Sequence, residues 1–144
     1  MRRLFAIFVL MLAAAQPAFS GTDTIVRVDR GSPQRAGILD AVRPLFIVET
    51  GGPIEFVVNT LNTMDGWAFG DVQLQRPGGI PIDWSKTKFA GANADGAFEA
   101  EHTLFLLQDT GNGWTLVEFA VGPTDVAWDW WRQQHSLPQE LFTK

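Results

Sequence analysis

Residues 114–131, WTLVEFAVGPTDVAWDWW, decide the predicted fold. The first eight of them, 114–121, are mostly apolar and rich in β-branched and aromatic side chains, which is typical of a buried strand. Gly122-Pro123 breaks this strand, and Thr124 has a side chain suited to the N-cap of a following helix. That helix carries three of the six tryptophans of the chain. The stretch therefore predicts a strand that needs neighbours in a sheet and a helix that needs a surface to cover.

Three upstream runs are predicted to be the neighbouring strands, which with residues 114–121 makes four strands. The three runs lie at residues 54–61, 67–75 and 98–108, and each of the four strands is apolar on at least one face. Asp65-Gly66, between the first two, is the two-residue signal of a hairpin. The sequence DTGNG at 109–113 predicts a tight turn between the last two. The pattern indicates two consecutive hairpins, and the third strand is apolar on both faces and therefore central.

A helix is predicted before the sheet. Ser32-Pro33 is a typical start, with an N-cap residue followed by proline at the first helical position. The residues that follow have an apolar and a charged face, as in an amphipathic helix of about three turns. Pro44 predicts a boundary or kink at Arg43. The pattern of residues 45–50 fits a continued helix and an extended segment equally well.

The order of elements predicts an α+β domain. A short extended arm at 24–29 precedes a helix, two strands, a long loop over 76–97, two more strands and a second helix. We expect a four-stranded antiparallel sheet with the N-terminal and C-terminal helices packed on one face. Pro138 is expected to end the second helix, and Leu141 and Phe142 to pin the tail on the core. Similar orders occur in cystatin-like and NTF2-like folds, an analogy that implies no function.

The first twenty residues are typical of a secretory signal peptide. Two arginines precede an apolar run over 4–15 that is too short to span a bilayer as a stable helix. Ala18 and Ser20 supply the small residues at the −3 and −1 positions of a cleavage site, and cleavage after Ala15 is the alternative. We expect a signal peptide cleaved near Ser20, followed by a single domain at 21–144.

Composition and charge narrow the classes of function. The chain has no cysteine, which fits the periplasm of a Gram-negative bacterium, or secretion, better than a disulfide-stapled scaffold. The net charge is −5, and cleavage would remove two arginines and make it −7, so nucleic-acid binding is not expected. No membrane span is expected after cleavage. No cofactor or metal site is expected, because the only two imidazoles, His102 and His135, form no metal-binding motif.

Two short motifs match enzyme signatures by chance. Asp109-Thr110-Gly111 matches the DTG of retroviral-type aspartic proteases, but it lies in a predicted hairpin turn that needs these residue types. Residues 85–88, SKTK, match the S-x-x-K of penicillin-binding enzymes, but the chain lacks their further elements. We interpret the first as a turn and the second as a polar loop.

Asp71, His102 and Glu118 fall within predicted strands and are the candidates for acid–base catalysis. A carboxylate or imidazole inside an apolar cup between sheet and helix can transfer protons to and from a substrate. The alternative is that these residues lie on the solvent face of the sheet, as polar strand residues usually do. If two of them converge in a cavity, the enzyme hypothesis gains weight. If all three face water, it loses its residues.

The long loop is the candidate for ligand binding. Arg76, Lys86 and Lys88 cluster there beside Trp84 in an otherwise acidic chain. A cationic patch with an aromatic platform can hold an anionic or sugar ligand. The alternative is that Trp84 packs inside the loop as its hydrophobic plug and the lysines are solvated. In the second helix, Trp128 is expected to remain partly exposed and is the candidate to anchor a partner. The alternative is that it packs against the loop or the tail.

Several segments resemble a group of small exported bacterial proteins with no assigned activity. They are GWAF at 66–69, RPGG and IDW within 76–84, GPTDVAW at 122–128 and LPQELF at 137–142. The resemblance implies one domain and export, and it assigns no catalytic residue. The leading hypothesis is a non-enzymatic periplasmic domain that binds a small ligand or envelope partner through the long loop and the tryptophan helix. The alternative is a cofactor-free isomerase or lyase that uses the strand residues.

Overall fold

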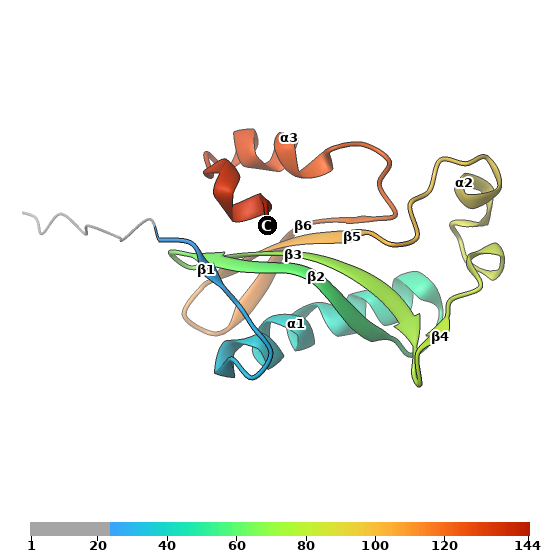
Figure 1. The fold of residues 1–144 in the computed structure, drawn as a ribbon, viewed down its shortest axis with the longest axis horizontal. Coiled ribbons are helices and arrows are strands. Elements are labelled where there is room, and N and C mark those ends of the chain that lie inside the picture. Colours follow the sequence, from blue (N-terminus) through green and yellow to red (C-terminus); the bar gives the residue numbers. More distant parts are fainter. Residues whose placement is uncertain (1–23) are drawn as a thin grey trace, which may run out of the picture.

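The structure, a computed structural model, describes residues 24–144, and the predicted signal peptide at 1–20 lies outside the described part. The described chain is an α+β fold with helices packed on an antiparallel sheet, as Figure 1 shows. The predicted fold class is therefore confirmed. No helix between residues 24 and 144 is both long enough and apolar enough to cross a membrane.

The sheet has six strands in the order β1-β2-β3-β5-β6, with β4 paired to β3. Its long strands are β2 (Glu55–Met64), β3 (Trp67–Arg76), β5 (Thr103–Asp109) and β6 (Trp114–Val121). All the pairings are antiparallel. The predicted number of four strands is wrong, because the N-terminal arm and the long loop each add a short strand: β1 (Val26–Arg27) and β4 (Ile80–Pro81).

The turn between β2 and β3 is the predicted hairpin. Met64 pairs with Trp67, so Asp65 and Gly66 form a two-residue loop. Both have positive φ, 43° and 75°, which is the backbone that the Asp-Gly pair favours and most other residues avoid. This turn sets the register of the pair from Met64 back to Thr60, where the register shifts.

The strand predicted at 98–108 begins later, at Thr103. Phe98 packs instead against Trp84 and Phe89 in the long loop, with ring centroids 4.7 and 5.5 Å away. The backbone N–H of His102 donates to the carbonyl of Glu99 at 3.0 Å, which makes a turn just before the strand. The aromatic contacts of Phe98 therefore override its strand propensity.

Helix α1 (Pro33–Thr50) passes through Pro44 without ending. The predicted boundary at Arg43 is therefore wrong, and residues 45–50 are helical. Ile38, Val42 and Phe46 are fully buried on the face that meets the sheet. The burial of each such side chain contributes about 1.5–3 kcal/mol, which offsets the hydrogen bond lost at the proline.

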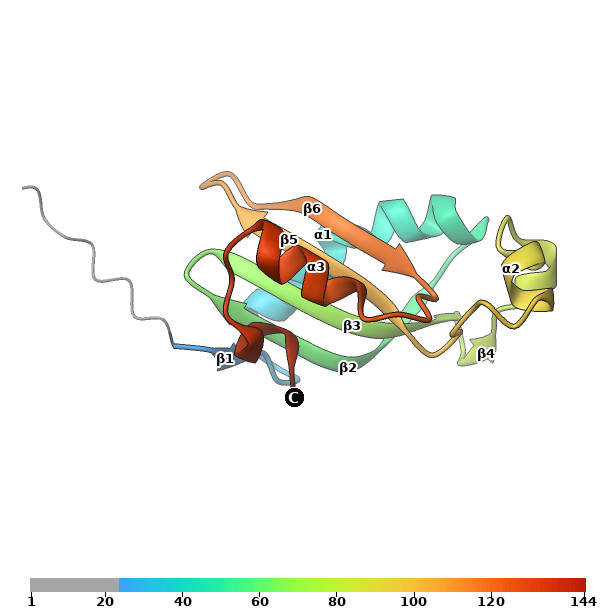
Figure 2. The ribbon, with the colours of Figure 1, turned by 90° about the horizontal axis from the view of Figure 1, so that it is seen from above.

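The helices cover opposite faces of the sheet, so the prediction that both lie on one face is wrong. α1 packs on one face against Phe105 and Leu107 of β5. The opposite face of the same strand, with Leu104 and Leu106, is covered by α3 (Ala127–Gln134) and the 3₁₀ turn η2 (Gln139–Phe142). Figure 2 looks onto this second face, with α1 behind the sheet. Both faces need a cover because side chains alternate along β5 and are apolar on both sides.

The C-terminal helix begins and ends inside its predicted limits. Its N-cap is Val126, whose side chain makes no capping bond, so the predicted cap at Thr124 is wrong. Residues 123–126 form an irregular connection to the helix instead. The tail packs as predicted, with Leu141 fully buried and Phe142 5% exposed. Asn62 of β2 holds it further, since its side-chain amide donates to the carbonyl of Leu141 at 3.1 Å.

Gly70 of β3 leaves the space that the ring of Phe105 fills. The two residues are direct partners across β3 and β5, and a Cβ added at Gly70 would overlap the ring. We predict that Gly70→Ala destabilises the protein by about 3 kcal/mol, as overpacking of a tight core does. Adding Phe105→Leu to Gly70→Ala should recover part of the lost free energy of unfolding, measured by urea unfolding of the double variant. Strictly additive effects of the two substitutions would contradict this packing.

Glu55 at the start of β2 accepts hydrogen bonds from the backbone N–H of Gly78 at 3.0 Å and from the side chain of Gln75 at 3.3 Å. The bond from Gly78, more than that from Gln75, holds the pKa of Glu55 below its ordinary value of 4.5. Its stabilising effect is therefore present above pH 4.5 and is lost as the pH falls through the lower, folded-state pKa.

We predict that the carboxyl carbon of Glu55, followed by NMR, titrates below 4.5 in the folded protein. The same carbon should titrate near its ordinary value when the protein is unfolded in urea. Equal midpoints in the two states would show that the Gly78 bond does not form in solution.

Candidate functional site

Trp84, predicted as a possible ligand platform, lies inside the long loop. Its side chain is 8% exposed, and it packs against Phe98 and, edge to face at 5.9 Å, against Phe89. The short elements η1 (Trp84–Lys86) and α2 (Ala90–Ala94) fold around this aromatic cluster. This loop core buries Trp84, as the plug alternative predicted, and it is continuous with the core between α1 and the sheet.

The loop cations are engaged within the chain. Arg76 donates to the backbone carbonyl of Thr50 at 2.7 Å and to that of Pro53 at 3.1 Å, which ties β3 to the end of α1. Lys86 lies 3.6 Å from a carboxylate oxygen of Asp83, and Lys88 forms an ion pair with Glu49. The structure therefore does not bring Arg76, Lys86 and Lys88 together with Trp84 as a ligand site.

The burial of Trp84 makes a prediction that separates a core residue from a ligand platform. We expect Trp84→Ala to lower the free energy of unfolding by about 3–5 kcal/mol, because it removes a large side chain from the loop core. Trp130→Ala is the matched control, since Trp130 is 67% exposed and its loss should change stability by less than about 0.5 kcal/mol. Urea denaturation of both variants measures the difference. Equal effects would contradict the loop core.

Asp71 and His102, two of the three acid–base candidates, are in direct contact. His102 Nδ1 lies 3.0 Å from each carboxylate oxygen of Asp71. The sheet register brings them together, because Asp71 of β3 pairs with Leu104 of β5, and His102 lies two residues before Leu104 on the same face. Asn59 adds to the pair, with its amide 3.4 Å from Asp71 Oδ1 and 3.1 Å from the carbonyl of Glu101.

Burial gives the two side chains different roles. The side chain of Asp71 is 15% exposed, whereas that of His102 is 47% exposed. In the tautomer that donates from Nδ1 to the carboxylate, the other ring nitrogen, Nε2, keeps its lone pair. Within residues 24–144, Nε2 of His102 has no hydrogen-bond partner. The carboxylate therefore orients an imidazole whose second nitrogen is available to a ligand.

Both residues line a groove of about 340 Å³. Phe69 and Leu104 contribute from the sheet face, and Phe142 and Trp128 contribute from the C-terminal cover. The last two rings are stacked, with centroids 5.6 Å apart and planes 17° from parallel. The groove therefore combines these apolar and aromatic side chains with the Asp71–His102 pair, and its lining is more polar than apolar.

The remaining charged groups of the groove are carboxylates. Glu99 and Asp125 line it together with Asp71, and no lysine or arginine of the described chain does. These acids do not form a metal centre, since no three histidine, cysteine, aspartate or glutamate side chains between residues 24 and 144 are grouped to hold a metal ion. The charge of the groove favours a neutral or cationic ligand over an anionic one.

Glu118, the third acid–base candidate, lies elsewhere on the same sheet face. Its Oε1 is 3.2 Å from Nε2 of His135 at the end of α3, and the two side chains are 27% and 20% exposed. The imidazole of His135 also packs on Trp67, with ring centroids 5.4 Å apart. The contact joins α3 to the sheet and does not line the groove.

The tryptophans of α3 have three different environments. Trp131 is 5% exposed in the core, and Trp130 is 67% exposed. Trp128 is half-buried, in agreement with its predicted partial exposure, and its ring lines the groove. Trp130 is nevertheless the tryptophan of this helix most accessible to a protein partner.

Sequence reasoning missed Asn59, Glu99 and Asp125 as residues of the site. Asn59 occupies the irregular position between Val58 and Thr60 where the β2–β3 register shifts, and nothing local in the sequence marks this bulge. Asp125 directly follows Thr124 at the predicted start of the helix, where a negative charge is favourable to the helix dipole and indicates no site. A contact such as that between Asn59 and Glu101 spans 42 positions and has no local signal.

Comparison with known proteins found no match to this chain among protein-family models, curated proteins or solved structures. The similarity to small exported bacterial proteins therefore remains a prediction.

Proposed function

We propose that the protein is a cofactor-free acid–base enzyme, of isomerase or lyase type, that acts on a small organic molecule in the groove. The observation that carries the proposal is the Asp71–His102 pair at the wall of a cavity with an aromatic side. Two of the three candidate residues converge there, which is the condition under which the enzyme hypothesis gains over simple binding. The signal-peptide pattern at 1–20 supports action outside the cytoplasm, in the periplasm of a Gram-negative bacterium or after secretion.

In this proposal His102 is the general base. Nε2 removes a proton from the bound molecule and returns it to another atom, while Asp71 accepts the hydrogen bond from Nδ1–H and stabilises the imidazolium that forms. Asn59 restrains Asp71 through its amide. Such a positioned base contributes about 10²–10⁴-fold to a reaction rate.

The groove sets the class of substrate. Its volume of about 340 Å³ suits a small molecule and not a polymer. The rings of Trp128 and Phe142 favour an apolar or aromatic part, and Glu99 and Asp125 disfavour a carboxylate or phosphate. We therefore propose a neutral or cationic substrate with a planar apolar portion.

The second candidate is a non-enzymatic binding domain for a small ligand or envelope partner. The exposure of Trp130 and the acidic, aromatic lining of the groove favour it, because a cationic ligand gains from carboxylates and from the face of Trp128. In that case the contacts among Asp71, His102 and Asn59 only hold β2, β3 and β5 together, and these side chains take part in no reaction. The similarity of the element order to cystatin-like and NTF2-like domains favours neither candidate.

A pair of histidine variants tests the enzyme proposal. We predict that the protein accelerates ring opening of 5-nitrobenzisoxazole, a probe that reacts when a base removes the C3–H proton of its isoxazole ring and the N–O bond breaks to give a phenolate. His102→Gln should lower this rate by about tenfold or more, because the base is lost. His135→Gln is the matched control, since His135 also pairs with a carboxylate but lies outside the groove. Absorbance of the phenolate product measures the rate.

The outcomes separate the two candidates. Equal rates in wild type, His102→Gln and His135→Gln reject the general-base role. Binding is then read from a thermal-shift series with phenethylamine and choline, which raise the melting temperature with concentration if they bind the native state. A saturable shift that is lost in Trp128→Ala, with no His102-dependent rate, supports the binding domain. The absence of both effects rejects both candidates.

A further inference from the structure

The outer edge of β2 is only partly covered by β1. β1 pairs with Asn62 and Thr63, and the N–H of Val28 donates to the carbonyl of Leu61 at 2.8 Å. The chain then turns away, where the N–H of Ser32 donates to the carbonyl of Asp29. Within residues 24–144, no strand pairs with the outer side of β2 before Leu61. An unpaired edge of this kind is a template for a further strand.

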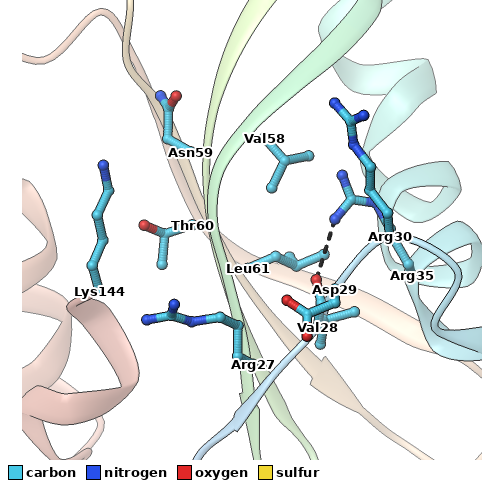
Figure 3. Close-up of a pocket in the computed structure, with 10 residues that line it drawn as sticks. All are labelled: Arg27, Val28, Asp29, Arg30, Arg35, Val58, Asn59, Thr60, Leu61 and Lys144. Carbon is cyan, nitrogen blue, oxygen red and sulfur yellow. Dashed lines mark hydrogen bonds between the residues drawn. The ribbon is translucent and has the colours of Figure 1, made fainter.

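A cavity of about 260 Å³ lies beside this edge and is lined by cations. Arg27, Arg30, Arg35 and Lys144 line it with one carboxylate, Asp29 (Figure 3). These are four of the eleven lysines and arginines of a chain whose net charge is −5. The excess of positive charge is therefore local, and it is complementary to an anionic partner.

The strand separates the cations into two groups. In Figure 3, Arg27 and Lys144 lie on one side of the β2 ribbon, and Arg30 and Arg35 lie on the other. A compact anion such as phosphate contacts one group and leaves the other. An extended peptide laid along β2 sends successive side chains to opposite sides, so its carboxylates reach both groups. The arrangement of charge thus fits a strand and not a point charge.

Two of these arginines are not used to hold the fold. Arg35 donates to the carbonyl of Val28 at 3.2 Å and supports the turn after β1. Arg27 and Arg30 are exposed, and within the described chain their side chains form no hydrogen bond or ion pair. Their guanidinium groups are available for carboxylates of a partner, where planar bidentate pairs are strong.

We propose that the outer edge of β2, at residues 57–60, binds an acidic peptide segment that adds to the sheet as a strand. Backbone groups of the edge on either side of the irregularity at Asn59 hold the peptide, and Arg27 and Lys144 on one side and Arg30 and Arg35 on the other select its carboxylates. The site lies outside the groove of His102, with Asn59 between the two, and it does not depend on the proposed enzyme activity.

The test uses a fluorescein-labelled peptide, Val-Glu-Glu-Val-Glu-Glu-Val with blocked ends, whose glutamates lie on both sides of an extended chain. We expect a saturable rise in fluorescence anisotropy with the protein at low salt. Arg27→Gln combined with Arg30→Gln should weaken binding by about tenfold, as the loss of two exposed ion pairs does. Lys86→Gln combined with Lys88→Gln is the control with the same change in net charge, and it should bind as the wild type does.

Four results would overturn the proposal. The peptide with N-methyl groups at alternate amides cannot pair as a strand, so equal binding of this peptide rejects strand addition. Displacement of the peptide by an equal concentration of a single-stranded oligonucleotide, or equal loss in both double variants, indicates nonspecific attraction of polyanions. No change in anisotropy at any protein concentration leaves the arginines without a peptide partner and rejects the site.

Discussion

The structure depends on the burial of both faces of β5. Residues 104–107 are at most 6% exposed, and they alternate between the face under α1 and the face under α3 and η2. Each of these four side chains contributes about 1.5–3 kcal/mol on burial, and neither face retains that contribution without its cover. The strand therefore requires a neighbour on each side and a helix layer above and below. The hairpins, the helix at each end of the chain and the pinned tail all satisfy this one requirement.

The groove exists because α3, which covers one face of the sheet, is much shorter than α1, which covers the other. α1 has 18 residues and is about 27 Å long, whereas α3 has 8 residues and is about 12 Å long. β3 has 10 residues and extends for about 33 Å, so α3 and η2 leave part of their face uncovered. Along β3 the side chains on this face are Trp67, Phe69, Asp71, Gln73 and Gln75, and the first two pack under the cover. The polar pair lies where the apolar cover ends.

Much of the fold and part of the site were predictable from local signals. Asp65-Gly66 specified a hairpin because its two positive φ values suit few other residues. The two-sided apolar pattern of 104–107 marked a central strand, and Asp71 and His102 were identified as polar residues on strands. Other features had no such signal. The burial of Trp84 depends on Phe89 and Phe98, and the passage of α1 through Pro44 depends on Phe46 being buried by the sheet.

The sequence by itself determined the class of fold, the long strands, their turns and the chemical types available to a site. It did so because backbone conformation and the alternation of side chains along a strand are local properties. Only the tertiary structure decided which charges meet. The β3–β5 register brings Asp71 into contact with His102, and the packing of α3 brings His135 into contact with Glu118. The two loop lysines form ion pairs with Asp83 and Glu49. These pairings follow from register, layer order and helix length, which arise from burial summed over the whole chain and are encoded at no single position.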